Sequence, residues 1–426
     1  MKPRMKAYTV AGLSVLLLAG CGSAGSSGTP SKAPTKIATS GMKGTITVLT
    51  NRTDMQANGM LNKYSKAFEK LYPGTKVKWQ TFVDNNTVQV QMNGGVYPDV
   101  MMILPTLTPS ELPQFFAPLN NLGLGNKVYF NNYQAYQGKV YGIATFGDVN
   151  GIVYNKAAFK KAGIKTIPRT MTQFYKDCAL LKKSGVVPIA LNYTDKWPLG
   201  NWSDVLGNLL AKNPNYLNTM VNSNAPFAQS TPEGQALTVA RTLVNRGYVE
   251  HDFKNTNWAN SKVMLAQGKF GMMFLGNWAV PQVISSGTTS NNIGFFPFPA
   301  SNNGKNIAIL TPDWFLAVNK HSKSIPVAEA FVKWEVVNSG YADYAGGIPT
   351  LKTQKSNVPQ LVAFEKEATV IPGVPTSAQW TKIANSAQLD LTGGGAVQTV
   401  LTTKNLSAAL QQMNQAWASA KSMTGQ

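Results

Sequence analysis

The order of apolar and polar positions along the chain predicts alternating strands and helices. Residues 44–50 alternate apolar and polar side chains and are rich in β-branched residues, which predicts a strand. Over residues 55–71 the apolar positions recur at helical spacing, until a Pro-Gly pair ends the pattern. Residues 75–79 predict a second strand, and the apolar run 98–104 predicts a buried one. This alternation predicts an α/β fold with a mostly parallel sheet.

The rest of the chain continues the pattern without an internal repeat at solenoid spacing. Residues 137–143 predict a hairpin turn that leads into a strand, and residues 152–154 a strand followed by a helix from Asn155. We expect further strands over 186–189, 270–274 and 315–318, and helices over 170–184, most of 200–270, 325–338 and 405–421.

The first 21 residues resemble a bacterial lipoprotein signal. Three basic residues precede an apolar run over 7–19, which is too short to span a bilayer and is typical of a secretory signal peptide. The run ends in Leu18-Ala19-Gly20-Cys21, which resembles the lipoprotein box. The resemblance implies that residues 1–20 are removed and that Cys21 is lipidated. The alternative is an ordinary signal peptide that happens to contain a cysteine.

The next segment, 21–43, is expected to be a flexible tether. After Cys21 it consists mainly of Gly, Ser, Thr, Pro, Ala and Lys, and it contains no aromatic residue. No later run is apolar and long enough to span a bilayer. We therefore expect the folded part to be held by lipid on the extracellular side of the cell membrane.

The charge balance is strongly basic because acids are scarce. The 426 residues include 39 Lys and Arg against 19 Asp and Glu, a net charge of +20. The lysines are scattered, so we do not expect a nucleic-acid partner. Two interpretations remain: attraction to an anionic envelope surface, or life in acid, where carboxylates become protonated.

Cysteine and histidine are too rare to suggest a disulfide scaffold or a His-rich metal site. The chain has two of each, and Cys178 lies in a helical pattern where a buried structural thiol is expected. The motifs HExxH, GxSxG, CxxC and the P-loop are absent. A glycosidase needs two positioned carboxylates, and no acid pair has a recognisable catalytic context. We expect no enzyme activity, cofactor or metal.

Several segments, in a shared order, resemble the extracellular sugar-binding proteins of ABC importers, the maltose-binding-protein-like family. The resemblance covers roughly residues 44–421. The segments that carry it are Phe68-Glu69-Lys70, Tyr72 to Val77, Tyr97-Pro98-Asp99-Val100, Gly138 to Ile143, Tyr154-Asn155-Lys156, Gly185 to Ile189, Gly276-Asn277-Trp278, Phe296 to Pro299, Asn319 to Lys323, Ala328 to Trp334, and Gly347 to Thr350.

The resemblance implies two α/β lobes joined by a hinge, with the ligand in the cleft between them. Lobe one would comprise 44–147 plus 316–358, and lobe two 148–315 plus 359–426. Ligand binding would close the lobes and present the protein to a membrane permease. The expected partners are a carbohydrate ligand and the permease subunits, and the protein is expected to be a monomer.

Aromatic residues suit the C–H faces of sugar rings, and the resemblance places four tryptophans at the cleft. Trp278 resembles the main stacking residue of the family. Trp197 matches an aromatic cleft segment, with Trp202 close by in the sequence, and Trp380 resembles a late cleft tryptophan. For each of them a place in the protein core is the alternative.

Polar side chains are expected to bind the hydroxyl groups of the ligand. Asp148 lies six residues before Tyr154, the spacing of a hydroxyl-binding carboxylate in the family; a turn residue is the alternative. Arg52 stands where the maltose-binding member has an acid, and the loop after Leu104 lacks the family's frequent Trp and Asp. The other expected contacts flank predicted strands: Asn51, Asp313 and Trp314.

These observations predict a receptor for a neutral sugar, such as a maltodextrin oligosaccharide. One alternative is an anionic ligand such as glycerol-3-phosphate, bound through Arg52 and lysines. A second is a cell-surface glycan-active enzyme or an adhesin.

Overall fold

The computed structural model describes residues 42–82 and 84–425 of the chain. The expected signal peptide, Cys21 and nearly all of the expected tether therefore lie outside the described residues. Within the described part, none of the helices combines the length and the apolar character needed to cross a membrane.

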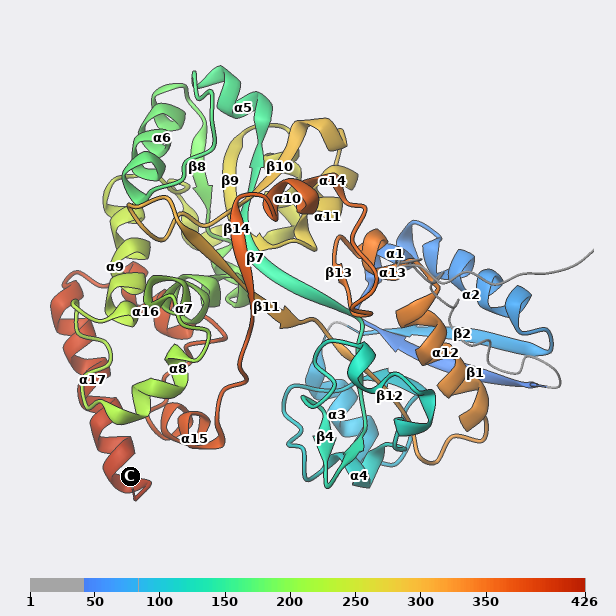
Figure 1. The fold of residues 1–426 in the computed structure, drawn as a ribbon. Helices are drawn as coiled ribbons and strands as arrows, with labels where there is room; N and C mark the ends of the chain where they lie inside the picture. The colour runs from blue at the N-terminus through green and yellow to red at the C-terminus, as the bar shows by residue number, and fades with distance from the viewer. Residues whose placement is uncertain (1–41, 83, 426) are drawn as a thin grey trace, which may run out of the picture. The chain divides into compact units, whose positions relative to one another are not determined.

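The first of two main sheets has five strands in the order β2-β1-β3-β12-β6 (Figure 1). Its strands are β1 (Gly44–Thr50), β2 (Thr75–Thr81), β3 (Val100–Met102), β6 (Ile143–Ala144) and β12 (Phe315–Val318). Strand β1 runs parallel to β2 and β3, whereas β12 is antiparallel to β3 and β6. The predicted strands at 44–50, 75–79, 98–104 and 315–318 are thus confirmed.

The helices around the first sheet are α1 (Thr53–Ala57), α2 (Met60–Leu71), α3 (Asn85–Asn93), α4 (Leu112–Phe115), α12 (Ile325–Val337) and α13 (Tyr341–Ala345). Helix α2 buries Phe68 against Phe331 and Trp334 of α12, at ring-centroid distances of 5.3 and 5.4 Å. The single helix predicted over 55–71 is in fact divided. Gly59 has a left-handed backbone with φ of 74°, which glycine adopts readily, and it separates α1 from α2.

The second sheet has the order β14-β11-β7-β9-β8, and β7 also pairs with β10 and β13. Its strands are β7 (Phe146–Asn155), β8 (Val187–Ala190), β9 (Phe270–Gly276), β10 (Ile293–Pro297), β11 (Asn306–Pro312), β13 (Ile348–Pro349) and β14 (Ala368–Pro372). Strand β7 is antiparallel to β9, β10 and β11, so the prediction of a mostly parallel sheet is wrong. An apolar run indicates burial on both faces, but it does not indicate the direction of the neighbouring strand.

We call each main sheet, together with the helices around it, a body. A small hairpin and several helices complete the two bodies. Strands β4 (Ala135–Tyr136) and β5 (Lys139–Val140) pair through a turn at Gln137 and Gly138, both with positive φ, which confirms the predicted hairpin. The second body carries α5 (Lys156–Lys161), α6 (Met171–Lys183), α7 (Asp204–Ala211), α8 (Tyr216–Thr219), α9 (Pro232–Asn245), α10 (Trp258–Ala266), α11 (Ala279–Ser285), α14 (Pro359–Phe364), α15 (Ala378–Ser386), α16 (Gly395–Thr402) and α17 (Leu406–Met423). Short 3-10 turns occur at Asn120–Leu122, Gly125–Lys127, Tyr193–Asp195, Trp197–Trp202, Met220–Asn222, Phe253–Asn255 and Ser290–Asn292.

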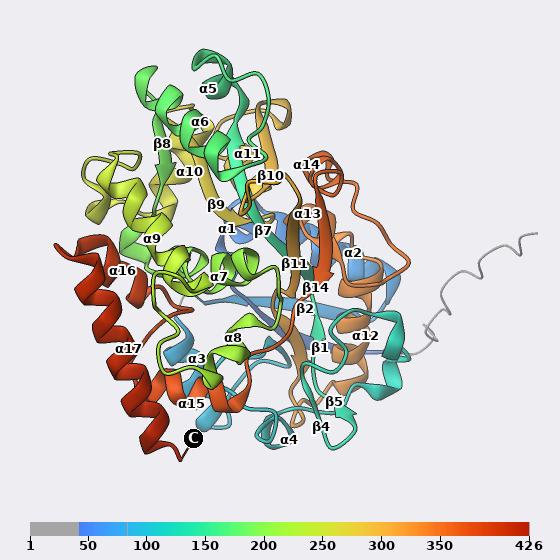
Figure 2. The same cartoon turned by 60° about the vertical axis from the view of Figure 1, so that its left-hand side comes forward.

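Local sequence explains how these helices begin and what they bury. The side chain of Asn155 accepts a hydrogen bond from the Ala158 amide and caps α5, and Thr170 caps α6 through the Gln173 amide. Cys178 is fully buried on α6, as predicted, and burial raises the pKa of its thiol well above the usual value. Figure 2 shows α17 and α15 side by side near the C-terminus, where Trp417 packs against Trp380.

Two of the points where the chain crosses between the two sheets lie next to each other. Thr145 links β6 to β7, and Asp313 with Trp314 links β11 to β12. The two crossings hydrogen-bond to each other: the Thr145 amide donates to the Trp314 carbonyl at 2.8 Å, and the Asp313 amide donates to the Phe146 carbonyl at 3.0 Å. The expected lobe boundaries stay a prediction.

Candidate functional site

Three tryptophans meet in what we call the tryptophan corner: Trp197, Trp258 and Trp278. The ring centroids are 5.5 Å apart between Trp197 and Trp278, 5.6 Å between Trp258 and Trp278, and 6.4 Å between Trp197 and Trp258. The interplanar angles lie between 50° and 81°, so the rings meet mostly edge to face. Trp197 remains 43% exposed and offers an aromatic surface to a ligand.

Local structure holds each ring of the corner. Lys196, which precedes Trp197, adopts a positive φ of 64° and turns the chain into the 3-10 segment Trp197–Trp202. The carboxylate of Asp195 accepts a hydrogen bond from the backbone amide of Trp258, the first residue of α10. This bond ties the segment of Trp197 to the start of α10, although the two are about 60 residues apart in the sequence.

The motif Gly276-Asn277-Trp278 connects the corner to both sheets. The indole of Trp278 folds back over Gly276, where an added Cβ would lie 2.3 Å from Nε1, so only glycine fits. Asn277 is fully buried; its Oδ1 accepts from the Val149 amide at 2.6 Å, and its Nδ2 donates to the Gly346 carbonyl at 2.7 Å. Trp278 packs against the apolar cores of both bodies and therefore lies at their junction.

Arg52 and Asp54 form an ion pair just beyond the end of β1. Arg52 donates from Nη2 and Nε to the two carboxylate oxygens of Asp54 at 2.7 and 2.8 Å. Its guanidinium also lies 5.8 Å from the ring centre of Tyr341 and 5.6 Å from that of Tyr344. Burial would raise the pKa of Asp54, but the hydrogen bonds and charge of Arg52 prevail and lower it. The positive charge of Arg52 is thus largely neutralised within the protein.

Lys262 lies one helical turn after Trp258 on α10 and adds a positive charge beside the tryptophan corner. Its Nζ lies 4.9 Å from the ring centre of Trp258, a cation–π distance. Burial lowers the pKa of Lys262, and the nearby charges of Asp54 and Arg52 act on it in opposite directions. A side chain of the second sheet's body therefore lies within electrostatic reach of the Arg52–Asp54 pair.

Two acids lie at the strand crossings. Asp148 on β7 is 9% exposed, and its Oδ1 is buried without a hydrogen-bond partner. Asp313 accepts a hydrogen bond at Oδ2 from the Thr145 hydroxyl at 2.9 Å. Burial raises the pKa of Asp148 well above its usual value, and the charge of Asp313 raises it further. Burial also raises the pKa of Asp313, against the effect of the Trp314 amide, Thr145 and Arg52.

Trp380 borders a cavity of about 670 Å³. The indole itself is only 5% exposed, and its Nε1 is buried without a partner. The cavity brings together Pro105, which follows β3, and the segment from α15 to the loop before α16: Thr376, Trp380, Thr381, Ala384, Asn385, Gln388, Leu389, Asp390, Leu391 and Thr392. Polar side chains therefore dominate its α15 side.

An ion pair joins this cavity to the tryptophan corner. Asp390, which lines the cavity, accepts from Lys196 Nζ at 2.7 Å, and Lys196 directly precedes Trp197. The triple-glycine loop packs here: a Cβ on Gly394 would lie 2.2 Å from the Lys196 carbonyl oxygen. This close approach explains why position 394 requires a glycine.

The remaining predicted site residues have different surroundings. Trp202 is 1% exposed and packs against Phe274 and Phe298 at 5.1 and 5.8 Å, so it lies in the interior of the second body. Trp314 is partly buried against Phe82 at 5.9 Å. Asn51 is half-buried next to Arg52 at the end of β1.

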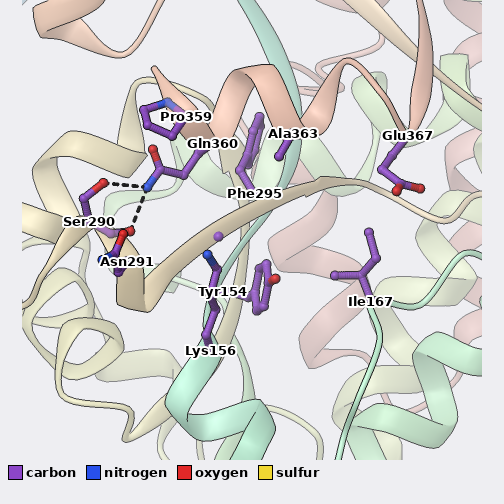
Figure 3. Close-up of a pocket in the computed structure, with 11 residues that line it drawn as sticks. Tyr154, Lys156, Ile167, Ser290, Asn291, Phe295, Pro359, Gln360, Ala363 and Glu367 are labelled. Carbon is purple, nitrogen blue, oxygen red and sulfur yellow. Dashed lines mark hydrogen bonds between the residues drawn. The ribbon is translucent and has the colours of Figure 1, made fainter. Parts of the chain in front are cut away.

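A separate hollow of about 180 Å³ lies at the far end of β7, beneath α14 and β10 (Figure 3). Figure 3 shows Gln360 donating to Ser290 at one end of the hollow and Glu367 at the other, and Glu367 is paired with Arg169 at 2.9 Å. Tyr154 borders this hollow six residues beyond Asp148, about 20 Å along the strand. None of the predicted site residues lines it.

Sequence reasoning missed Trp258, Lys262, Asp54 and Tyr341. An available signal was the pair Trp258 and Lys262, four residues apart at the start of a helix and thus on one face. As for metals, no group of three or more His, Cys, Asp or Glu residues within 42–82 and 84–425 is arranged to hold an ion. Both histidines are exposed.

The sequence matches the family model of bacterial extracellular solute-binding proteins over residues 55–334. Among curated proteins, it is 28% identical to the multiple sugar-binding protein of Streptococcus mutans over 305 residues, which are 68% of this chain and 71% of that protein.

Solved structures of solute-binding proteins also superpose on this chain. The binding protein BlMnBP1 of an ABC transporter from Bifidobacterium animalis subsp. lactis, in complex with mannobiose, superposes with a TM-score of 0.80 and 30% identity, over 90% of this chain and 95% of that one. The manno-oligosaccharide specific BlMnBP2 of the same organism, in complex with mannotriose, gives 0.79 and 28% over the same shares. The expected two-lobed α/β fold is confirmed.

Proposed function

Because the chain belongs to the bacterial extracellular solute-binding protein family, we propose that it binds a neutral oligosaccharide and delivers it to an ABC importer permease. The observation that carries this proposal is the tryptophan corner. Its rings present apolar faces that suit the C–H surface of a pyranose, and Trp197 keeps 43% of its surface exposed. Asp148 supplies an unpartnered buried acceptor for a hydroxyl group at the same junction.

A neutral ligand fits the charges better than an anionic one. Arg52, the cation that the anionic alternative needs, is held by both oxygens of Asp54. An anion would have to displace Asp54 and leave a partly buried carboxylate without its partner, which is costly. The acidic side chains of Asp148 and Asp313 would also repel an anion.

An oligosaccharide fits better than a single sugar. The cavity beside Trp380 would extend the site beyond the Lys196–Asp390 pair, and its side chains Asn385, Gln388 and Thr392 suit hydroxyl groups. The relatives bound to mannobiose and mannotriose support manno-oligosaccharides as the first class to test, beside maltodextrins. In this proposal Trp278, Trp258 and Trp197 stack on sugar rings, and Asn51, Asp313, Trp314 and Trp380 border the bound chain.

Lipid anchoring through Cys21 belongs to the same proposal. The lipobox resemblance and the tether composition support a protein that stands off the outer face of the cell membrane as a monomer. Metabolic labelling with a palmitate analogue, in the natural protein and in the Cys21→Ala variant, tests the anchor. Label that persists in the variant would contradict it.

We infer binding without turnover. A titration of intrinsic tryptophan fluorescence with manno-, malto-, xylo-, cello- and chito-oligosaccharides and glycerol-3-phosphate tests the proposal. A saturable response to one neutral class, with the sugar chromatographically unchanged, is expected. A response to glycerol-3-phosphate alone would refute the neutral-ligand assignment, and shortened sugar products would show an enzyme.

A further inference from the structure

Two of the 19 acidic residues lie side by side where the chain crosses between the sheets. In the antiparallel ladder of β7 and β11, Asp148 is paired with Thr311, and the Asp313 amide donates to the carbonyl of Phe146. Asp148 and Asp313 are therefore diagonal neighbours on one face of the ladder, a position in which side chains interact. Their carboxylates lie at these two strand crossings, where the backbone has to bend when the bodies move relative to each other.

The surrounding groups do not neutralise both acids. The Thr145 hydroxyl and the Trp314 amide serve Asp313, and Asn277 lies beside Asp148, whose Oδ1 still has no partner. The titratable groups facing the pair from other elements are Arg52 after β1 and Tyr341 on α13, and Glu335 on α12 acts in turn on Tyr341. Tyr341 and Glu335 bring no positive charge.

Arg52 is the one cation among these facing groups, and its guanidinium is already paired with other side chains. It forms a bidentate ion pair with Asp54 and donates a hydrogen bond to the Tyr341 hydroxyl at 3.4 Å. One guanidinium thus acts on three carboxylates: Asp54, Asp313 and Glu335. Two buried carboxylates at such proximity do not both ionise cheaply, so they hold a proton between them.

We propose that sugar binding takes up a proton at the Asp148–Asp313 pair, so that affinity rises as the medium becomes more acidic. The inference rests on the proposed sugar-binding function. When the bodies open, water reaches the two acids and lets both ionise; when they close on a ligand, that water is expelled and the second charge loses its hydration. The proton is therefore held more tightly in the bound state than in the free state.

The sign of the effect follows from this difference. If the pKa of the pair is higher in the bound state, the affinity for the sugar is highest at pH values below the pKa of the free state. The affinity then falls as the pH rises from the pKa of the free state to the pKa of the bound state. Within that window the dissociation constant is expected to increase up to tenfold for each pH unit.

Titration calorimetry of the natural protein tests the proposal at pH 5 to 8, with the oligosaccharide that saturates the fluorescence titration. At each pH two buffers with different ionisation enthalpies are compared, because the difference in heat counts the protons taken up. We expect no uptake below the pKa of the free state and an uptake that rises toward one proton per sugar as the pH passes that value.

Two variants assign the proton. Asp313→Asn leaves a single carboxylate and is expected to abolish the uptake and flatten the pH dependence; Asp148→Asn serves the same purpose if the first variant does not fold. The matched control is Glu250→Gln, which changes a buried acid that accepts from the Leu191 amide at 3.0 Å in the second body. This control is expected to retain the proton uptake of the natural protein.

Equal heats in both buffers across the pH range, with sugar bound, would overturn the proposal. Uptake that persists in Asp313→Asn would also overturn it, because the proton would then belong to another group. The absence of any binding heat would refute the proposed function itself, and it is distinguishable from a failure of proton coupling.

Discussion

A substitution of Trp197 gives the clearest test of whether an exposed tryptophan binds the ligand or only contributes to the structure. A tryptophan side chain presents up to about 250 Å², and Trp197 keeps 43% of its surface exposed, so roughly 100 Å² is available to a sugar. At about 25 cal/mol per Å², covering most of this area is worth about 1.5–2.5 kcal/mol. Trp197→Ala is therefore expected to raise the Kd roughly 10- to 70-fold.

The control is Trp202, five residues away in the same 3-10 segment but 1% exposed. Trp202→Ala leaves a cavity against Phe274 and Phe298 and is expected to cost about 3–5 kcal/mol of stability. The folded fraction of that variant should bind sugar within about twofold of the natural protein, since the ring is not available to a ligand.

Titration calorimetry and urea unfolding, applied to both variants, measure the two effects separately. Trp197→Ala should lose affinity with little change in the free energy of unfolding, and Trp202→Ala should show the reverse. An unchanged Kd in Trp197→Ala, at unchanged stability, would refute the stacking role of this ring. Trp197→Phe, which keeps an aromatic face, is expected to fall between the natural protein and the alanine variant.

Three further predictions concern stability and charge. Burial raises the pKa of Glu250 to about 7 from 4.5 when unfolded, so its stabilising effect is complete below pH 4.5 and is lost as the pH rises through 7. Glu250→Gln should therefore remove about 3 kcal/mol of the decline in stability between pH 4 and pH 8 measured by urea unfolding, and an unchanged decline would refute this. Asn277→Ala leaves the Val149 amide and the Gly346 carbonyl without their buried partner, so thermal unfolding should show a loss of about 2–4 kcal/mol; a loss below 1 kcal/mol would mean that water replaces the amide. Lys262→Met keeps the aliphatic stem over Trp258 but removes the charge, so calorimetry should show the affinity for a neutral sugar changed by less than about threefold, whereas a loss above tenfold would show that the ammonium binds the ligand.

Local periodicity was sufficient to predict most strands and helices, because each depends on neighbouring residues. The strand at Gly44–Thr50 and the helix at Met171–Lys183 follow directly from their apolar spacing and caps. Strand direction was not predictable in this way. Strand β7 arrives from the first sheet and runs against β9, β10 and β11, which depends on how the whole chain crosses between the bodies.

The site was partly predictable for the same reason. Trp197 and Trp202 look equivalent in sequence, yet one is exposed and the other lies in the core, because a 3-10 turn points them in different directions. Trp258 joins the corner with the help of the bond from its amide to Asp195, a contact between distant segments. The neighbourhood of Asp148 and Asp313 depends in turn on the register of β7 and β11.

Sugar binding itself is tested most directly by a calorimetric titration of the natural protein with manno-oligosaccharides of two to six units at pH 5. We expect saturable binding of one sugar per chain, with affinity that increases from the disaccharide until the cavity beside Trp380 is filled. No heat with this series or with any other neutral oligosaccharide, from a protein that unfolds cooperatively, would refute the proposed function.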